Sequence, residues 1–96
     1  MADIEVRIEE ADDGWTAVVE VSEDGGQTAH RVAVTRDAYE RLSGGGAATP
    51  EELVRRSFEF LLEREPKESI LREFDLTVIS RYFPEYEAEI GKRPND

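Results

Sequence analysis

Residues 3–34 read DIEVRIEEADDGWTAVVEVSEDGGQTAHRVAV, and the pattern of these residues indicates the fold class. Apolar and polar side chains alternate with a period of two in three segments: residues 3–10, 15–22 and 27–34. That period is typical of β-strands with one buried face. Asp12-Asp13-Gly14 and Asp24-Gly25-Gly26 separate the segments, and Asp-Gly favours the turns that match strand twist. The sequence therefore predicts a three-stranded antiparallel β-meander.

The next part of the chain predicts two helices. Thr35 is suited to cap a short helix over residues 36–42, which Gly44 would terminate. Thr49-Pro50-Glu51-Glu52 predicts the start of a longer helix over residues 50–64, because Thr caps, Pro suits the first position and Glu closes a capping box. Between the two helices we expect a glycine-rich linker over residues 44–48.

The segment 67–82 is harder to assign. Its apolar residues fit one helical stripe, yet Leu76-Thr77-Val78-Ile79 is also rich enough in β-branched residues for a strand. Asp75 would be the point at which a helix breaks and a second one is capped. We expect helix over residues 67–82, with any break at Asp75, and a last helix over residues 84–90.

The predicted fold class is therefore α+β. One face of the three-stranded meander would be covered by three or four helices, since an apolar sheet face must be buried by another layer. We expect a single domain over residues 1–92 and a disordered tail over residues 93–96.

Charge limits the classes of partner. The 96-residue chain has 12 basic and 23 acidic side chains and a net charge of −11 at pH 7. Phosphate contacts supply most of the affinity for nucleic acids, so we expect no nucleic-acid partner and, for the same reason, no membrane partner. Cysteine is absent, which excludes disulfides and thiolate sites. With no signal peptide visible at the N-terminus, this favours a cytoplasmic protein.

A search for catalytic groups finds no recognisable constellation. His30 is the only histidine, and metal sites and catalytic triads normally need partners that this chain lacks. A hydrogen-bonded histidine at the rim of the sheet is the simpler interpretation, while a base aided by a nearby carboxylate stays open. We therefore assign no catalytic residue, no metal ligand and no cofactor, and the sequence favours a protein that is not an enzyme.

Two surfaces remain as candidates. Three aromatic residues near the C-terminus, Tyr82, Phe83 and Tyr86, flank a proline and would suit an interaction surface, unless they complete the core. The edges of an open sheet would also suit a protein partner or a second copy. A non-enzymatic protein-interaction or regulatory domain is the favoured hypothesis. The alternative is a small-ligand-binding or weakly enzymatic domain, with Trp15, His30 and Arg31 lining a pocket between sheet and helices.

The layout also resembles the small antitoxins of the HicB type. The resemblance covers the strand from Gly14-Trp15 to Val21 and the helix start at Thr49-Pro50-Glu51-Glu52. It implies strands followed by a helix. The Pro-Asp-Leu-Pro-Gly-Cys segment expected between them is absent, so no residue role follows from it.

Overall fold

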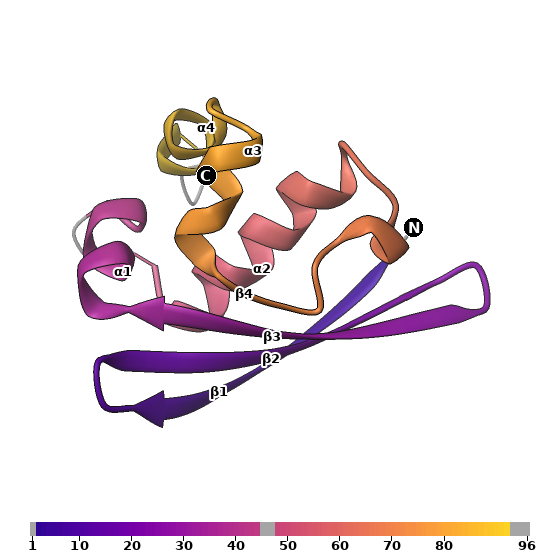
Figure 1. Ribbon diagram of the computed structural model, residues 1–96, viewed down its shortest axis with the longest axis horizontal. Coiled ribbons are helices and arrows are strands. Elements are labelled where there is room, and N and C mark those ends of the chain that lie inside the picture. The colour runs from indigo at the N-terminus through magenta and orange to yellow at the C-terminus, as the bar shows by residue number, and fades with distance from the viewer. Residues whose placement is uncertain (1, 45–47, 93–96) are drawn as a thin grey trace.

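The antiparallel meander predicted from residues 3–34 is present in the computed structural model, which describes residues 2–44 and 48–92. Its strands are β1 (Asp3–Ala11), β2 (Gly14–Glu23) and β3 (Gly26–Thr35) (Figure 1). Asp24 and Gly25 have φ angles of 56° and 79°. Two positive φ angles in a two-residue loop define a type I′ turn. The Asp-Gly signal therefore closes the second hairpin as predicted.

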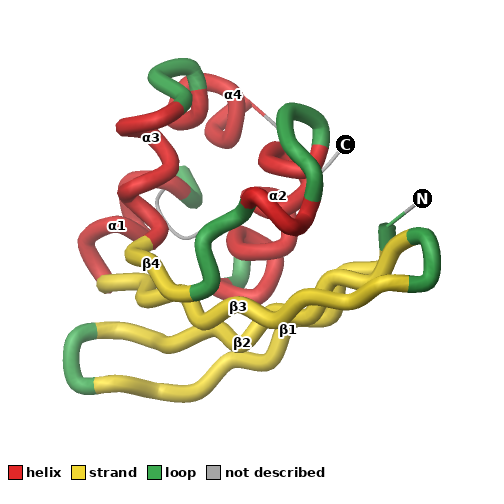
Figure 2. The backbone as a smooth tube through the Cα atoms, turned by 45° about the vertical axis from the view of Figure 1, so that its right-hand side comes forward, coloured by secondary structure: helices red, strands yellow, loops and turns green. Residues whose placement is uncertain are grey.

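One face of the sheet is buried, as the alternation of the sequence requires. The register places Val6 opposite Val19 and Val19 opposite His30, so the inward residues of the three strands share a face. The fully buried members of this face come from β2 and β3, whereas those of β1 are half-buried. The helices gather over this face, and the opposite face is left without a covering layer (Figure 2).

The two predicted helix starts are correct. Helix α1 (Arg36–Leu42) begins after Thr35, whose hydroxyl oxygen accepts a hydrogen bond from the Ala38 amide at 3.1 Å. Helix α2 (Pro50–Leu62) begins after Thr49 with both hydrogen bonds of the capping box, each at 3.1 Å. Residues 45–47 of the expected linker and the expected tail, residues 93–96, lie outside the described residues.

The single helix predicted over residues 67–82 is wrong. The segment instead contains two 3₁₀ turns, one short strand and one turn of helix: η1 (Lys67–Ser69), β4 (Glu73–Asp75), η2 (Leu76–Val78) and α3 (Ile79–Tyr82). The alternative of a strand over residues 76–79 is wrong as well, because those residues are helical. The cap that the sequence suggested at Asp75 is present, since its carboxylate accepts a hydrogen bond from the Thr77 amide at 2.9 Å, but the residues directly before it form β4 and not a helix.

Strand β4 adds a fourth strand to the sheet, and it runs parallel to β3. The Arg31 amide donates to the Arg72 carbonyl oxygen at 2.7 Å, which brings the chain alongside β3 just before β4 begins. Phe74 of β4 packs on Phe58 of α2 with ring centroids 6.1 Å apart. Pairing with a strand edge and burial of one aromatic ring therefore outweigh the helical periodicity of this segment.

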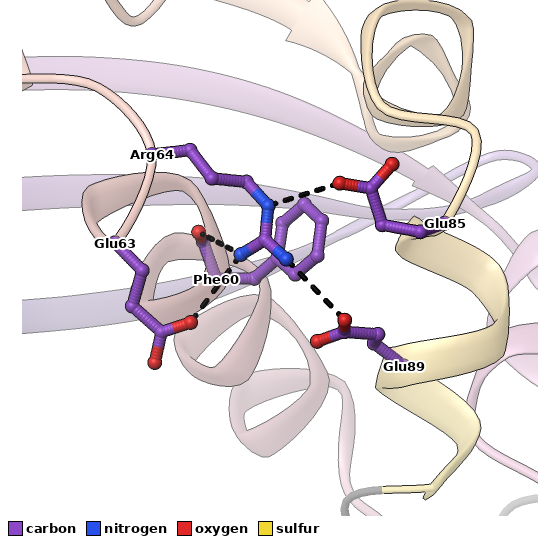
Figure 3. Close-up of polar contacts among 5 residues, drawn as sticks. All are labelled: Phe60, Glu63, Arg64, Glu85 and Glu89. Atoms are coloured by element: carbon purple, nitrogen blue, oxygen red, sulfur yellow. Dashed lines mark hydrogen bonds and ion pairs between the residues drawn. The ribbon is translucent and has the colours of Figure 1, made fainter.

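One arginine helps to hold the last helix, α4 (Tyr86–Lys92), against the end of α2. Arg64 donates to Glu85 at 3.2 Å and to Glu89 at 3.4 Å, and it lies over the Phe60 ring at 3.7 Å from the centroid (Figure 3). Its side chain is only 22% exposed. These contacts join two parts of the chain that the sequence does not connect by any local signal.

Among the described residues, no helix is both long enough and apolar enough to cross a membrane.

Candidate functional site

A groove with mainly apolar walls lies beside α3. Its volume is about 220 Å³, and its walls come from the end of α2, residues 69–74 and the η2–α3 turn. The apolar side chains lining this α3 groove are Leu61, Ile70, Leu71, Phe74, Val78, Ile79, Tyr82 and Phe83. Leu71 is 47% exposed and Tyr82 is 66% exposed, and they are the two large apolar side chains that stand exposed in the described part of the chain.

Backbone contacts on both sides fix the position of Leu71. The Ile70 amide donates to the Lys67 carbonyl oxygen at 3.3 Å, which ends η1 and turns the chain toward β3. The Leu71 carbonyl oxygen then accepts a hydrogen bond from His30 at 2.7 Å. The backbone of Leu71 is therefore fixed against β3, while its side chain stays exposed at the surface.

Tyr82 is exposed for a related reason. Helix α3 has only four residues, and its buried side is occupied by Ile79. The Phe83 amide donates to the Ile79 carbonyl oxygen at 2.8 Å, and Phe83 packs edge-on against Phe60 at 5.9 Å. Since a four-residue helix cannot bury both sides, Tyr82 remains at the rim of the groove.

The floor of the groove is rigid, because it is part of the core. Ile70 and Ile79 are 5% and 3% exposed. Phe74 and Phe83 are half-buried and rest on two aromatic rings of α2, those of Phe58 and Phe60. A ligand would therefore meet a preformed surface, which reduces the entropy lost on binding.

Glu65 is the charged residue in the lining of the groove. Partial burial raises the pKa of its carboxyl above the usual value. The net charge of the chain, −11, gives the wider surroundings a negative character. The groove therefore combines apolar walls with a carboxylate that a cation would stabilise.

His30 is packed into the core at the edge of this region. It is 3% exposed, and its ring lies 5.3 Å from that of Phe58. Its Nδ1 donates to the Leu71 carbonyl, so in the neutral ring Nε2 accepts from the Thr28 hydroxyl at 2.8 Å. Burial lowers the pKa of His30, the hydrogen bond to Leu71 opposes this, and the nearby Arg72 lowers it further. Both ring nitrogens are used, which leaves none for a substrate.

The predicted ligand-binding residues are not brought together. Trp15 lies toward the other end of the sheet, edge-on to Tyr39 at 5.0 Å and under the Arg36 guanidinium at 5.0 Å. Arg31 is exposed, and because it directly follows His30 in β3, its side chain is on the opposite face of the sheet. His30 is buried on the inner face of the sheet, opposite Val19.

The three C-terminal aromatic residues have separate positions. Tyr82 is exposed, Phe83 is half-buried in the groove, and Tyr86 is completely buried. The hydroxyl groups of Tyr86 and Ser57 lie 2.6 Å apart, and burial raises the pKa of the Tyr86 phenol well above its usual range. Tyr86 therefore belongs to the core, while Tyr82 and Phe83 line a common surface.

Sequence reasoning missed Leu71, Val78 and Glu65 as groove residues. The continuous helix predicted over residues 67–82 would turn Leu71 and Val78 toward the sheet, and Glu65 lies between the helices predicted over residues 50–64 and 67–82. The signal that was available is Asp75 as a helix break, because it implies that the residues on its two sides follow different periodicities. Among the described residues, no cluster of three histidine or acidic side chains is arranged to hold a metal ion.

Comparisons with known proteins identify no relative. No family model matches the chain, and neither curated proteins nor solved structures give a significant match. The likeness to the HicB-type antitoxins therefore stays one of layout.

Proposed function

We propose that this protein is a small, non-enzymatic interaction domain of the cytoplasm, and that the α3 groove is its binding surface. One observation carries the proposal: the two exposed large apolar side chains, Leu71 and Tyr82, line the same groove. Scattered single apolar residues are ordinary on protein surfaces, but exposed ones that converge on a preformed hollow are typical of recognition sites.

The chemistry of the groove indicates the kind of partner. Its apolar walls suit one or two apolar side chains of a peptide segment, and the volume of about 220 Å³ is too small for a folded domain to enter. Glu65 in the lining and the net charge of −11 favour a basic segment. We therefore propose a basic partner protein that inserts a leucine or an aromatic side chain flanked by arginine or lysine.

The alternative of a small-ligand-binding or weakly enzymatic domain has less support. Trp15, His30 and Arg31 lie in three different environments, and the ring nitrogens of His30 are both hydrogen-bonded inside the protein. A nucleic-acid or membrane partner is disfavoured by the net charge.

The proposal is tested with synthetic peptides and amide chemical shifts in NMR spectra. The probe is a peptide with one phenylalanine flanked by arginines, and the control peptide replaces phenylalanine by serine. We expect shift changes centred on Leu71, Val78 and Tyr82 with the first peptide only. Leu71→Asp should weaken binding at least about tenfold, because it places a charge on the apolar wall.

The matched control is Val18→Ser, which alters a half-exposed apolar residue on the uncovered face of the sheet. This variant should bind the peptide as the parent protein does. If the chemical-shift changes spread over the acidic surface and Leu71→Asp does not alter them, the peptide is attracted by charge alone. That result would refute the proposed site.

A further inference from the structure

Strand β1 is an outer strand of the sheet. The strand order is β1-β2-β3-β4, so one edge of β1 has no neighbouring strand within the described residues. β1 is nine residues long. The other outer strand, β4, has only three residues. A long open edge presents unpaired amide and carbonyl groups, which are the groups that pair with another strand.

The contact made by Arg55 shows which backbone groups point out of this edge. Its guanidinium, which comes from α2, donates to the carbonyl oxygen of Ile4. That carbonyl is therefore directed away from β2. Because the direction of the backbone groups alternates along an antiparallel strand, the amides and carbonyls of Val6 and Ile8 point out of the same edge.

The two faces of β1 carry different side chains. Ile4, Val6 and Ile8 are half-buried and pack against the core, so each still exposes part of an apolar side chain beside the open edge. On the other face Glu5 and Arg7 are exposed. The strand thus has an apolar row of side chains on one face and a charged row on the other, and both rows lie beside the same open edge.

We infer that β1 pairs in antiparallel fashion with β1 of a second copy, with Val6 opposite Val6 of that copy. This register places Arg7 of each copy opposite Glu5 of the other, which forms two Glu–Arg pairs. It also places Ile4 of each copy opposite Ile8 of the other. Opposite charges and apolar side chains that face each other directly across two strands are stabilising.

Neighbouring registers are less favourable. A shift of the second strand by one residue puts the apolar row of one copy against the charged row of the other. A shift by two residues in one direction places Arg7 opposite Arg7, and in the other direction it places Glu5 opposite Glu5. Among these neighbouring registers, only the one centred on Val6 opposes unlike charges without a like-charged pair at its centre. The more distant register centred on Ile8 also places Arg7 opposite Glu9, but it sets Val6 against Glu10.

The ends of β1 limit the pairing to its middle. In the proposed register Asp3 faces Glu9 of the second copy, and Arg55 already occupies the Ile4 carbonyl oxygen. Like charges directly opposite each other are destabilising. The dimer is therefore held by residues 4–8, and it forms reversibly as the protein concentration rises.

Sedimentation velocity from about 10 μM to about 1 mM protein tests the inference, and the proposed pairing predicts a dimer that increases with concentration. Arg7→Glu and Glu5→Arg should each weaken the dimer about tenfold, because each creates like-charged pairs. The double variant, Glu5→Arg with Arg7→Glu, should restore dimerisation to within about threefold, because it exchanges the two charges and keeps them complementary.

Two further variants separate edge pairing from other causes. Val6→Pro removes an amide that points out of the edge and leaves the hydrogen bonds to β2, so it should abolish the dimer in a folded protein. Arg31→Glu is the matched control, since it makes the same charge change on β3 and should leave the dimer unchanged. Circular dichroism checks that each variant is folded.

A protein that stays monomeric at about 1 mM would overturn the inference. So would a double variant as weak as the single ones, because that result excludes the register centred on Val6. Loss of the dimer in Leu71→Asp would place the interface at the α3 groove and would also overturn it.

Discussion

Residues 3–62 and residues 63–92 are built in different ways. The first region consists of three strands of nine or ten residues and two capped helices. In the second region no element is longer than seven residues. The first region forms from signals that lie within a few residues of each element. The second is shaped by contacts with the first, and for that reason its apolar side chains do not all reach the core.

Two polar contacts show this dependence. The Leu71 carbonyl oxygen accepts a hydrogen bond from His30, and Ser57 is hydrogen-bonded to Tyr86. The residues that they join are 41 and 29 positions apart in the chain. The exposed groove is therefore a consequence of how the second region is attached to the first, and this attachment can be altered separately from the sheet.

The largest effect on stability is expected from Phe60→Ala, which removes packing contacts between the two regions. Phe60 is fully buried and contacts Phe83, Tyr86 and the Arg64 guanidinium. Removal of a buried phenylalanine side chain leaves a cavity, so we expect the free energy of unfolding to fall by roughly 3–5 kcal/mol. Urea unfolding followed by circular dichroism measures this value.

Leu62→Ala is the control, because Leu62 is a half-buried neighbour on the same helix. Leu62→Ala should lower the free energy of unfolding by less than half as much as Phe60→Ala. If Phe60→Ala cost under about 1 kcal/mol, the second region would not depend on packing at this ring, and the contrast between the two regions would fail.

The next effect belongs to the first region. A Cβ atom at Gly14 would lie 2.1 Å from the Val34 carbonyl oxygen, a backbone atom of the sheet that has little freedom to move. We expect Gly14→Ala to lower the free energy of unfolding by about 3 kcal/mol. Gly25→Ala is the matched control: its φ is also positive, at +79°, but nothing lies within 4 Å, so about 1 kcal/mol is expected. Equal costs for the two variants would show that φ alone, and not the close approach, matters at Gly14.

Most of the first region could be predicted because its signals are local. Alternation gave the three strands, Asp24-Gly25 gave a type I′ turn, and Thr49 with Glu52 gave a capping box. Strand β4 could not be predicted in the same way. Its three residues carry no period of their own, and its place is set by the edge of β3 and by the Phe58 ring.

The candidate site was only partly predictable for the same physical reason. Tyr82 and Phe83 were expected at an interaction surface, and the structure places both at the groove, although Tyr86 is in the core. The direction of each side chain depends on where the helix breaks. Because one helix was predicted over residues 67–82, Leu71 was not identified as a residue of the groove.

The smallest effect concerns the contact between His30 and Leu71, which joins the two regions. Burial lowers the pKa of His30 in the folded protein. In the unfolded chain His30 takes up a proton near the usual histidine pKa of about 6.5, whereas in the folded protein it stays neutral to a lower pH. The unfolded state thus binds more protons, and the free energy of unfolding should fall as the pH is lowered from about 7 to about 5.5. Urea midpoints measured across this range test the direction.

The matched variant for this effect is His30→Gln, which has no titrating ring. Its stability should change less over the same pH range than that of the parent protein. An identical pH dependence in both proteins would assign the effect to carboxylates instead of His30.

The parallel pairing of β4 with β3 has a consequence for the order of folding. Each hairpin of the meander closes through a two-residue turn, whereas His30 and Leu71 must meet across 41 positions. Closing a long loop costs more entropy than closing a short one, so non-local pairings form late and open early. We therefore expect the amides around Phe74 to exchange with solvent sooner than those of β2. The α3 groove is then the last surface to be completed as the chain folds, and a bound peptide would protect those amides by holding β4 in place.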